Sequence, residues 1–166
     1  RMGSDNKIVR LLISRAKTNP KKIVFAEADH LSVLKAAQIV LEEGIGIPVL
    51  LGRREVILEL MSQIEFDEDV EIIDPKSDTQ TEKLNEYAAI FWKNRKRKGI
   101  TLYEAKKLMR ERNYYAAMMV NEGDADAMIS GYSRSYSTVL KPVLETIGKF
   151  EGVNKVYKFA RLRDVN

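Results

Sequence analysis

The chain has 166 residues, of which 45% are hydrophobic and 31% charged, and its formal net charge at pH 7 is +4. This length suits one domain with its own core, and the composition is that of an ordinary globular protein. No apolar run approaches the roughly 20 residues that span a bilayer, and no apolar segment follows the start RMGSDNK, so we expect neither a membrane segment nor a secretory signal. The absence of cysteine excludes disulfides, a thiolate nucleophile and a Cys-bound metal, and it fits the cytoplasm, where we expect this protein.

Apolar periodicity predicts helices alternating with short strands of a buried type. Helices are expected over residues 6–17, 31–43, 52–64, 79–98, 101–112, 114–121 and 137–147, and strands over 22–27, 47–51, 70–73 and 127–130. Asp29 is expected to cap the second helix, and Thr79 with Glu82 forms a capping-box pattern, as does Thr101 with Glu104 three residues on. The alternation predicts a three-layer α/β/α fold with a mainly parallel sheet.

The chain divides into three expected segments. Residues 1–20 contain a start, RMGS, that resembles a cloning scar, followed by an amphipathic leading helix. Residues 21–150 form the α/β domain. Residues 151–166 show little apolar periodicity and no closing element, so this tail stays unassigned and the chain is expected to be a fragment of a longer protein.

A loop rich in hydroxyl groups follows the strand expected over 127–130 and runs into the next helix. Open α/β sheets bind ligands beyond the C-terminal ends of their strands, and a helix N-terminus attracts anions. Such loops are also common as simple turns and caps, which is the alternative interpretation. The residues proposed to bind a phosphate or a CoA ester are Ser130, Gly131, Ser133, Arg134, Ser135, Thr138 and Lys141, with Arg53 and Arg54 at another strand end as weaker candidates.

Other patterns favour structural roles. The acidic cluster at 122–126 lacks EF-hand spacing, so a turn with a solvated or helix-capping carboxylate is expected rather than a metal site. His30 is the only histidine and is expected in a loop or cap. The basic run at 93–98 is interpreted as a helix end that Gly99 terminates; a surface for nucleic acid is the alternative, and we expect no nucleic-acid partner. The G-x-G-x-x-G and P-loop fingerprints are absent.

The segment YYAAMMVNEGDADAMISG, with the loop after it and LKPVLETIG, resembles the phosphate acetyl/butyryltransferase family. KKIVFAEADHLSVLKAAQIVLEEGIGIPVLLGR and the KGIT at 98–101 extend the resemblance to roughly residues 21–155. The loop GYSRSY at 131–136 is more similar to the acetyltransferase-like C-terminal region of bacterial NADP-dependent malic enzymes. The resemblance implies the first half of a two-domain α/β/α unit in which CoA and acyl phosphate meet in the interdomain cleft.

The resemblance implies a main function and an alternative. The main one is part of an NADP-dependent malic enzyme, which decarboxylates malate oxidatively to pyruvate. NADP and Mg²⁺ or Mn²⁺ would belong to a part missing here, and this region would bind acetyl-CoA as a regulator and catalyse nothing alone, because the family's catalytic serine and aspartate lie in the absent C-terminal half. The alternative is phosphate acetyltransferase, which makes acetyl phosphate and CoA from acetyl-CoA and phosphate.

Lys141 stands where the transferases carry arginine, which keeps the charge but loses a bidentate phosphate contact. This exchange favours the regulatory role. The expected partners are acetyl-CoA or phosphate, the remainder of the same polypeptide, and further copies of the chain in a homo-oligomer. No cofactor is expected within the chain itself.

Overall fold

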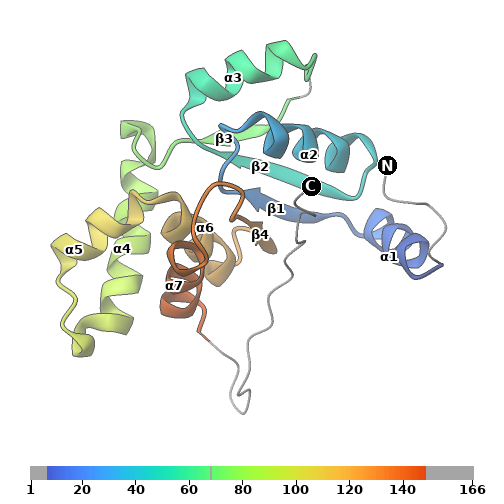
Figure 1. Cartoon of the computed structure of the whole chain (residues 1–166). Coiled ribbons are helices and arrows are strands. Elements are labelled where there is room, and N and C mark those ends of the chain that lie inside the picture. Colours follow the sequence, from blue (N-terminus) through green and yellow to red (C-terminus); the bar gives the residue numbers. More distant parts are fainter. Residues whose placement is uncertain (1–6, 68, 149–166) are drawn as a thin grey trace.

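The computed structural model describes residues 7–67 and 69–148 (Figure 1). Its centre is a sheet of four strands in the order β3-β2-β1-β4, in which each neighbouring pair is parallel. The strands are β1 (Lys21–Phe25), β2 (Gly46–Leu51), β3 (Glu71–Ile73) and β4 (Ala127–Ile129). The predicted α/β class with a parallel sheet is confirmed. The starting RMGS and the tail at 151–166 lie outside the described residues.

Helices lie on both faces of the sheet, which gives the three layers (Figure 1). Their bounds are α1 (Lys7–Thr18), α2 (Leu31–Glu42), α3 (Arg54–Gln63), α4 (Thr81–Arg95), α5 (Leu102–Met109), α6 (Arg112–Glu122) and α7 (Tyr136–Thr146). The α2 and α3 helices cover one face, α4 to α7 lie on the other, and α1 lies to one side. Among the described helices, none has the length and apolar character needed to cross a bilayer.

The side-chain alternation of the strands divides the core into two clusters. Val24 and Val49 point toward α4, α5 and α6, whereas Phe25 and Leu50 point toward α2 and α3, and all four are buried. The expectation of strands buried on both faces is therefore confirmed for β1 and β2. It is wrong for β4, whose Ile129 is 47% exposed, because β4 is an edge strand within the described chain and no described helix covers that side.

The long helix expected over 79–98 is three consecutive pieces. Ser77, not Thr79, accepts the capping hydrogen bond, from the Thr79 N–H at 3.3 Å, and begins a 3₁₀ turn, η1 (Asp78–Gln80), ahead of α4. The expected Thr79 capping box is therefore wrong. A second 3₁₀ turn, η2 (Lys96–Lys98), follows α4 and ends at Gly99 with φ +87°, which confirms that the basic run lies at a helix end.

The capping box of α5 is confirmed. The Thr101 N–H donates to the Glu104 carboxylate at 2.8 Å, and the Glu104 N–H donates to the Thr101 hydroxyl at 3.2 Å. These two bonds satisfy backbone donors that the first turn of a helix leaves without partners. The start of α5, and with it the turn that follows α4, is thereby fixed.

A non-glycine residue in the left-handed region ends α3. Glu65 has φ +53°, and the Phe66 N–H donates across it to the Met61 carbonyl at 3.0 Å. A side chain in this conformation costs on the order of 1–2 kcal/mol, which glycine avoids.

Glu65→Gly should relieve this strain, but glycine also increases the conformational entropy of the unfolded chain. The net result should be a rise of about 0.5–1 kcal/mol in the free energy of unfolding. Urea denaturation measures this change.

The matched control is Glu59→Gly, at an exposed position inside the same helix. There the same substitution should lower the free energy of unfolding by about 1 kcal/mol. A loss of stability at both positions would contradict the strain assigned to Glu65.

Candidate functional site

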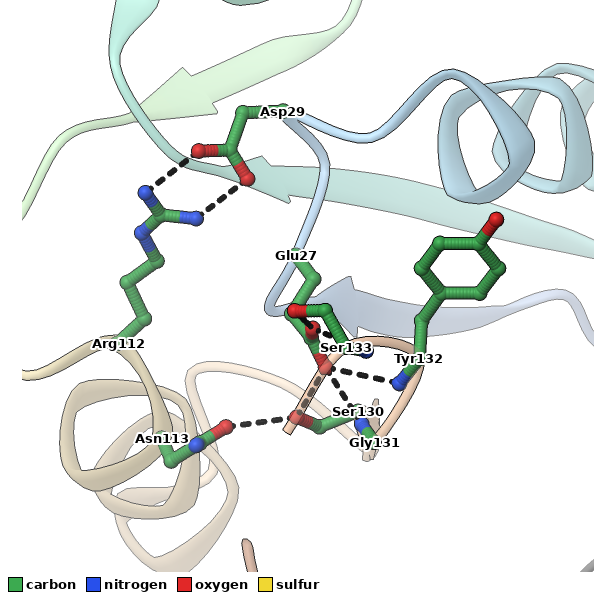
Figure 2. Close-up of polar contacts among 8 residues, drawn as sticks. All are labelled: Glu27, Asp29, Arg112, Asn113, Ser130, Gly131, Tyr132 and Ser133. Carbon is green, nitrogen blue, oxygen red and sulfur yellow. Dashed lines mark hydrogen bonds and ion pairs between the residues drawn. The ribbon is translucent and has the colours of Figure 1, made fainter. Parts of the chain in front are cut away.

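Two connections meet at the C-terminal edge of the sheet. Because β1 and β4 are parallel neighbours, the residues after Phe25 and those after Ile129 emerge side by side. The Ala26 N–H still donates to the Ile129 carbonyl at 3.0 Å, so this pairing extends one residue beyond the strands. Figure 2 shows the polar contacts made where the two connections meet.

The carboxylate of Glu27, in the β1–α2 connection, is the centre of these contacts (Figure 2). It is only 4% exposed. Its Oε1 accepts from the N–H of Gly131 at 2.6 Å, the N–H of Tyr132 at 3.0 Å and the hydroxyl of Ser130 at 3.2 Å. Its Oε2 accepts from the N–H and the hydroxyl of Ser133 at 2.8 and 2.5 Å. The loop after β4 thus wraps around a carboxylate of the protein itself.

These donors set the charge state of Glu27. Burial alone would raise the pKa of its carboxyl, but the side chain and N–H of Ser133 and the N–H groups of Gly131 and Tyr132 lower it from 4.5 to about 2. Glu27 is therefore ionised at neutral pH although it is buried.

A second acidic residue of the same connection fixes helix α6. The guanidinium of Arg112 donates to both carboxylate oxygens of Asp29, at 2.5 and 2.6 Å. Burial raises the pKa of Asp29, but the hydrogen bonds and charge of Arg112 outweigh it and hold that pKa below its usual range. The side-chain oxygen of the next residue, Asn113, is the nearer acceptor of the Ser130 hydroxyl, whose single proton is shared between Asn113 at 2.7 Å and Glu27 at 3.2 Å. Helix α6 is thus joined to the β1–α2 connection through Arg112 and to the loop after β4 through Asn113.

The prediction that Asp29 caps α2 is wrong. His30 is the N-cap residue, and it forms no capping hydrogen bond through its side chain. A bidentate bond between two charged groups is stronger than a bond to one helix N–H, and Arg112 lies within its reach. His30 lies in the loop, as predicted, with its ring centroid 5.4 Å from that of Tyr132.

Beside Glu27 there is a small cavity of about 90 Å³. Its lining residues are Ala26, Glu27, Lys76, Arg110, Glu111, Arg112, Asn113, Arg134 and Thr138. Within the described chain, Arg112 is the only one of the four lining cations that forms an ion pair. The charge of Glu27 is satisfied by the loop, so the cavity is rich in positive charge and suits an anion.

The predicted site residues fall into three groups. Arg134 and Thr138 line the cavity. Ser130, Gly131 and Ser133 bind Glu27, which leaves their donor groups already engaged.

The remaining candidates lie outside the cavity lining. The Ser135 hydroxyl bonds within its own turn, to the hydroxyls of Ser137 and Thr138 at 3.1 and 2.7 Å. Lys141 is exposed further along α7, and Arg53 and Arg54 are exposed at the start of α3.

Sequence reasoning missed several residues of the site. Glu27 and Lys76 follow β1 and β3 closely, so their place at the C-terminal edge of the sheet was a usable signal. Arg110 directly follows α5, and Arg112 and Asn113 begin α6, so no strand end precedes them. Nothing in their spacing indicated that these residues reach the same edge.

The acidic cluster at 122–126 is part of the opposite edge of the sheet. Asp124 accepts from the Tyr87 hydroxyl and pairs with Lys83 at 2.9 Å, so the expected solvated or capping carboxylate is wrong for this residue. Asp126 accepts from the Lys22 N–H at 2.8 Å and ties β1 to the β4 entrance. Over residues 7–67 and 69–148, no three acidic or histidine side chains gather as a metal site would require.

Comparison with known proteins identifies the family. The family model described as "Phosphate acetyl/butaryl transferase" matches residues 7–163, and the chain belongs to this family. A phosphate acetyltransferase of Thermoanaerobacterium thermosaccharolyticum is 39% identical over 152 residues, 92% of this chain and 45% of the relative. A phosphotransacetylase structure from Streptococcus pyogenes superimposes with a TM-score of 0.72 at 33% identity, covering 83% of this chain and 42% of that one.

Two malic enzymes of Rhizobium meliloti match the same region. The NADP-dependent one is 32% identical over 137 residues, 82% of this chain and 18% of the enzyme. The NAD-dependent one is 33% identical over 153 residues, 88% of this chain and 19% of the enzyme. The chain thus spans less than half the length of the relatives it matches.

The Glu27 contacts predict a specific pH dependence of stability. Because the folded pKa is about 2 against an ordinary value of 4.5, the stabilisation is complete above pH 4.5 and is lost as the pH falls toward 2. Glu27→Gln should cost about 3 kcal/mol of unfolding free energy at pH 7, and the gap to wild type should shrink between pH 4.5 and 2. Urea denaturation across this range measures it; a gap that is constant with pH would contradict the assigned charge.

Proposed function

We propose that the parent protein is a phosphate acetyltransferase, which transfers an acetyl group between CoA and phosphate, and that this chain contributes a phosphate-binding half-site. The observation that carries the proposal is the cavity beside Glu27, with Arg134, Lys76 and Arg110 in its lining. The greater identity to a phosphate acetyltransferase than to the malic enzymes supports it.

The size of the cavity favours a small anion. Sites that enclose a drug-sized ligand usually measure roughly 300–1,000 Å³. At about 90 Å³, this cavity has room for a phosphoryl group but not for a whole CoA ester. Inorganic phosphate, or the phosphate of an acyl phosphate, is therefore the ligand we assign to it.

The charges in the cavity favour the same ligand. The charge of Arg112 is matched by Asp29, and that of Glu27 by loop donors. Three cationic side chains then face one further carboxylate, Glu111. The hydroxyl of Thr138, in the first turn of α7, adds a donor of the kind that binds phosphate oxygens.

In the proposed reaction a phosphate oxygen attacks the carbonyl carbon of acetyl-CoA. The new C–O bond forms, the C–S bond breaks, and CoA leaves as the thiolate. The contribution of this chain is to hold and orient the phosphate, which converts an encounter in solution into a positioned attack. The remainder of the polypeptide would supply the other half of the site.

The described chain also exposes apolar side chains that the rest of the parent polypeptide could cover. Leu144 on α7 is 37% exposed, Ile147 just after α7 is 41% exposed, and Ile129 on the edge strand is 47% exposed. We assign this apolar surface to contact with the rest of the parent chain, and a homo-oligomer in the cytoplasm remains our proposal for the assembled protein.

A malic enzyme parent is the second candidate. Lys141 in place of arginine and the GYSRSY loop favour it, as do the two malic enzyme relatives. In that case the cavity would bind a phosphate group of acetyl-CoA as a regulator. Malate oxidation, with NADP and Mg²⁺ or Mn²⁺, would take place in another part of the protein.

Substitutions of Arg134 and Lys141 should have different effects on the affinity for phosphate. Each substitution to alanine removes one exposed cation after the same strand, but only Arg134 lines the cavity. Arg134→Ala should weaken phosphate binding about 10-fold or more, the value of one charge-assisted hydrogen bond, and Lys141→Ala should change it less than about 2-fold. Isothermal titration of the 166-residue chain with inorganic phosphate measures both. Equal losses in the two variants would remove the cavity from the proposed site.

Two assays of the intact parent distinguish the candidate functions. A transferase forms acetyl phosphate from acetyl-CoA and phosphate, whereas a malic enzyme forms NADPH from malate and NADP. Acetyl phosphate formation without malate oxidation is the expected result. The reverse pattern would establish the second candidate.

A further inference from the structure

Glu27 is a buried charged group that the proposed transfer does not consume. It lines the cavity, yet a carboxylate next to an anion site should oppose anion binding. Its position therefore requires a reason other than direct contact with the ligand.

We propose that Glu27 is a positioning residue for phosphate binding: its carboxylate holds the loop after β4 in the conformation that presents Arg134 to the cavity. The inference rests on the proposed function, because it concerns the same cavity. It assigns to Glu27 a role that acts through Arg134 rather than through the ligand.

The geometry of the loop supports this role. Three consecutive N–H groups, from Gly131 to Ser133, converge on one carboxylate at 2.6 to 3.0 Å. Convergence of successive N–H groups requires an irregular backbone, and Gly131 supplies it with φ +99°, where other residues are strained. Without an anion at this point, three neighbouring N–H groups would point at the same place with no acceptor for their hydrogen bonds.

Ser133, the residue before Arg134, is also held by Glu27. Ser133 is held through both its N–H and its hydroxyl, so the backbone that leads into Arg134 starts from a fixed point. In the described chain Arg134 has no ion pair that would orient it independently. The position of the Arg134 guanidinium at the cavity thus depends on the two hydrogen bonds by which Glu27 holds Ser133.

Glu111 differs from Glu27 in its surroundings. This second glutamate also lines the cavity, but it is exposed and its carboxylate makes no hydrogen bond or ion pair in the described chain. Simple electrostatics predicts that removing either negative charge strengthens anion binding. The positioning role predicts that the two substitutions act in opposite directions.

The experiment compares Glu27→Gln with Glu111→Gln in the 166-residue chain, titrated with inorganic phosphate by calorimetry at pH 7. Glutamine keeps the shape of the side chain, but its NH₂ group cannot accept hydrogen bonds from the N–H groups of the loop. Glu27→Gln should therefore weaken phosphate binding about 10-fold. Glu111→Gln should leave the affinity unchanged or raise it. Tighter binding by Glu27→Gln would show that Glu27 acts only as a negative charge, and would overturn the proposal.

Two further variants extend the test. Glu27→Asp keeps the charge, so it should recover part of the affinity that Glu27→Gln loses; a Glu27→Asp variant weaker than Glu27→Gln would contradict a role that depends on charge. If Glu27→Gln does not fold, Ser133→Ala removes one donor while the carboxylate stays. It should weaken phosphate binding about 3-fold or more, and unchanged affinity would overturn the proposal.

The outcomes also separate this proposal from the proposed function. A wild-type chain that binds no phosphate removes the half-site, and the positioning role with it. A wild-type chain that binds phosphate, with Glu27→Gln binding equally well, removes the positioning role alone.

Discussion

A carboxylate withdrawn from water loses several kcal/mol of hydration, and it stays ionised only if donors replace the lost water. At Glu27 the replacement comes from one short loop, which supplies three N–H groups and two hydroxyls. The dependence is mutual, because the N–H groups of Gly131, Tyr132 and Ser133 in turn donate to this side chain. The burial of Glu27, its ionisation and the conformation of the loop after β4 therefore depend on one another, and together they set the shape of the site.

From this contact the constraints extend around the site. Ser130 bonds to Asn113, the neighbouring Arg112 binds Asp29, and Asp29 lies two residues from Glu27 (Figure 2). This closed chain of contacts joins the β1–α2 connection, the β4–α7 loop and the start of α6. It also supplies hydrogen-bond partners to the carboxylates of Glu27 and Asp29, whereas Glu111, which lines the cavity, is exposed. In the proposed anion site, the cations on the cavity wall take the place of a glycine-rich phosphate loop.

The sequence was sufficient for features that depend on local patterns. Apolar alternation predicted the parallel strands, Thr101 and Glu104 predicted a cap, and the position of Arg134 after a strand predicted its place at the C-terminal edge of the sheet, where it lines the cavity. It was insufficient where a distant partner competes with a local one. Asp29 binds a guanidinium 83 residues away instead of its own helix, and Glu27 binds donors more than 100 residues away. Such partners depend on which strands become neighbours, which no single segment encodes.

The central claim is that the carboxylate of Glu27 holds the inward N–H groups of the loop. Amide hydrogen exchange at Gly131, Tyr132 and Ser133, compared between wild type and Glu27→Gln, tests it directly, with Val24 in β1 as the internal reference. The account predicts that these three amides are protected in wild type although they lie in an exposed loop, and that Glu27→Gln exposes them while Val24 keeps its protection. Equal exchange at the three amides in both proteins would contradict it.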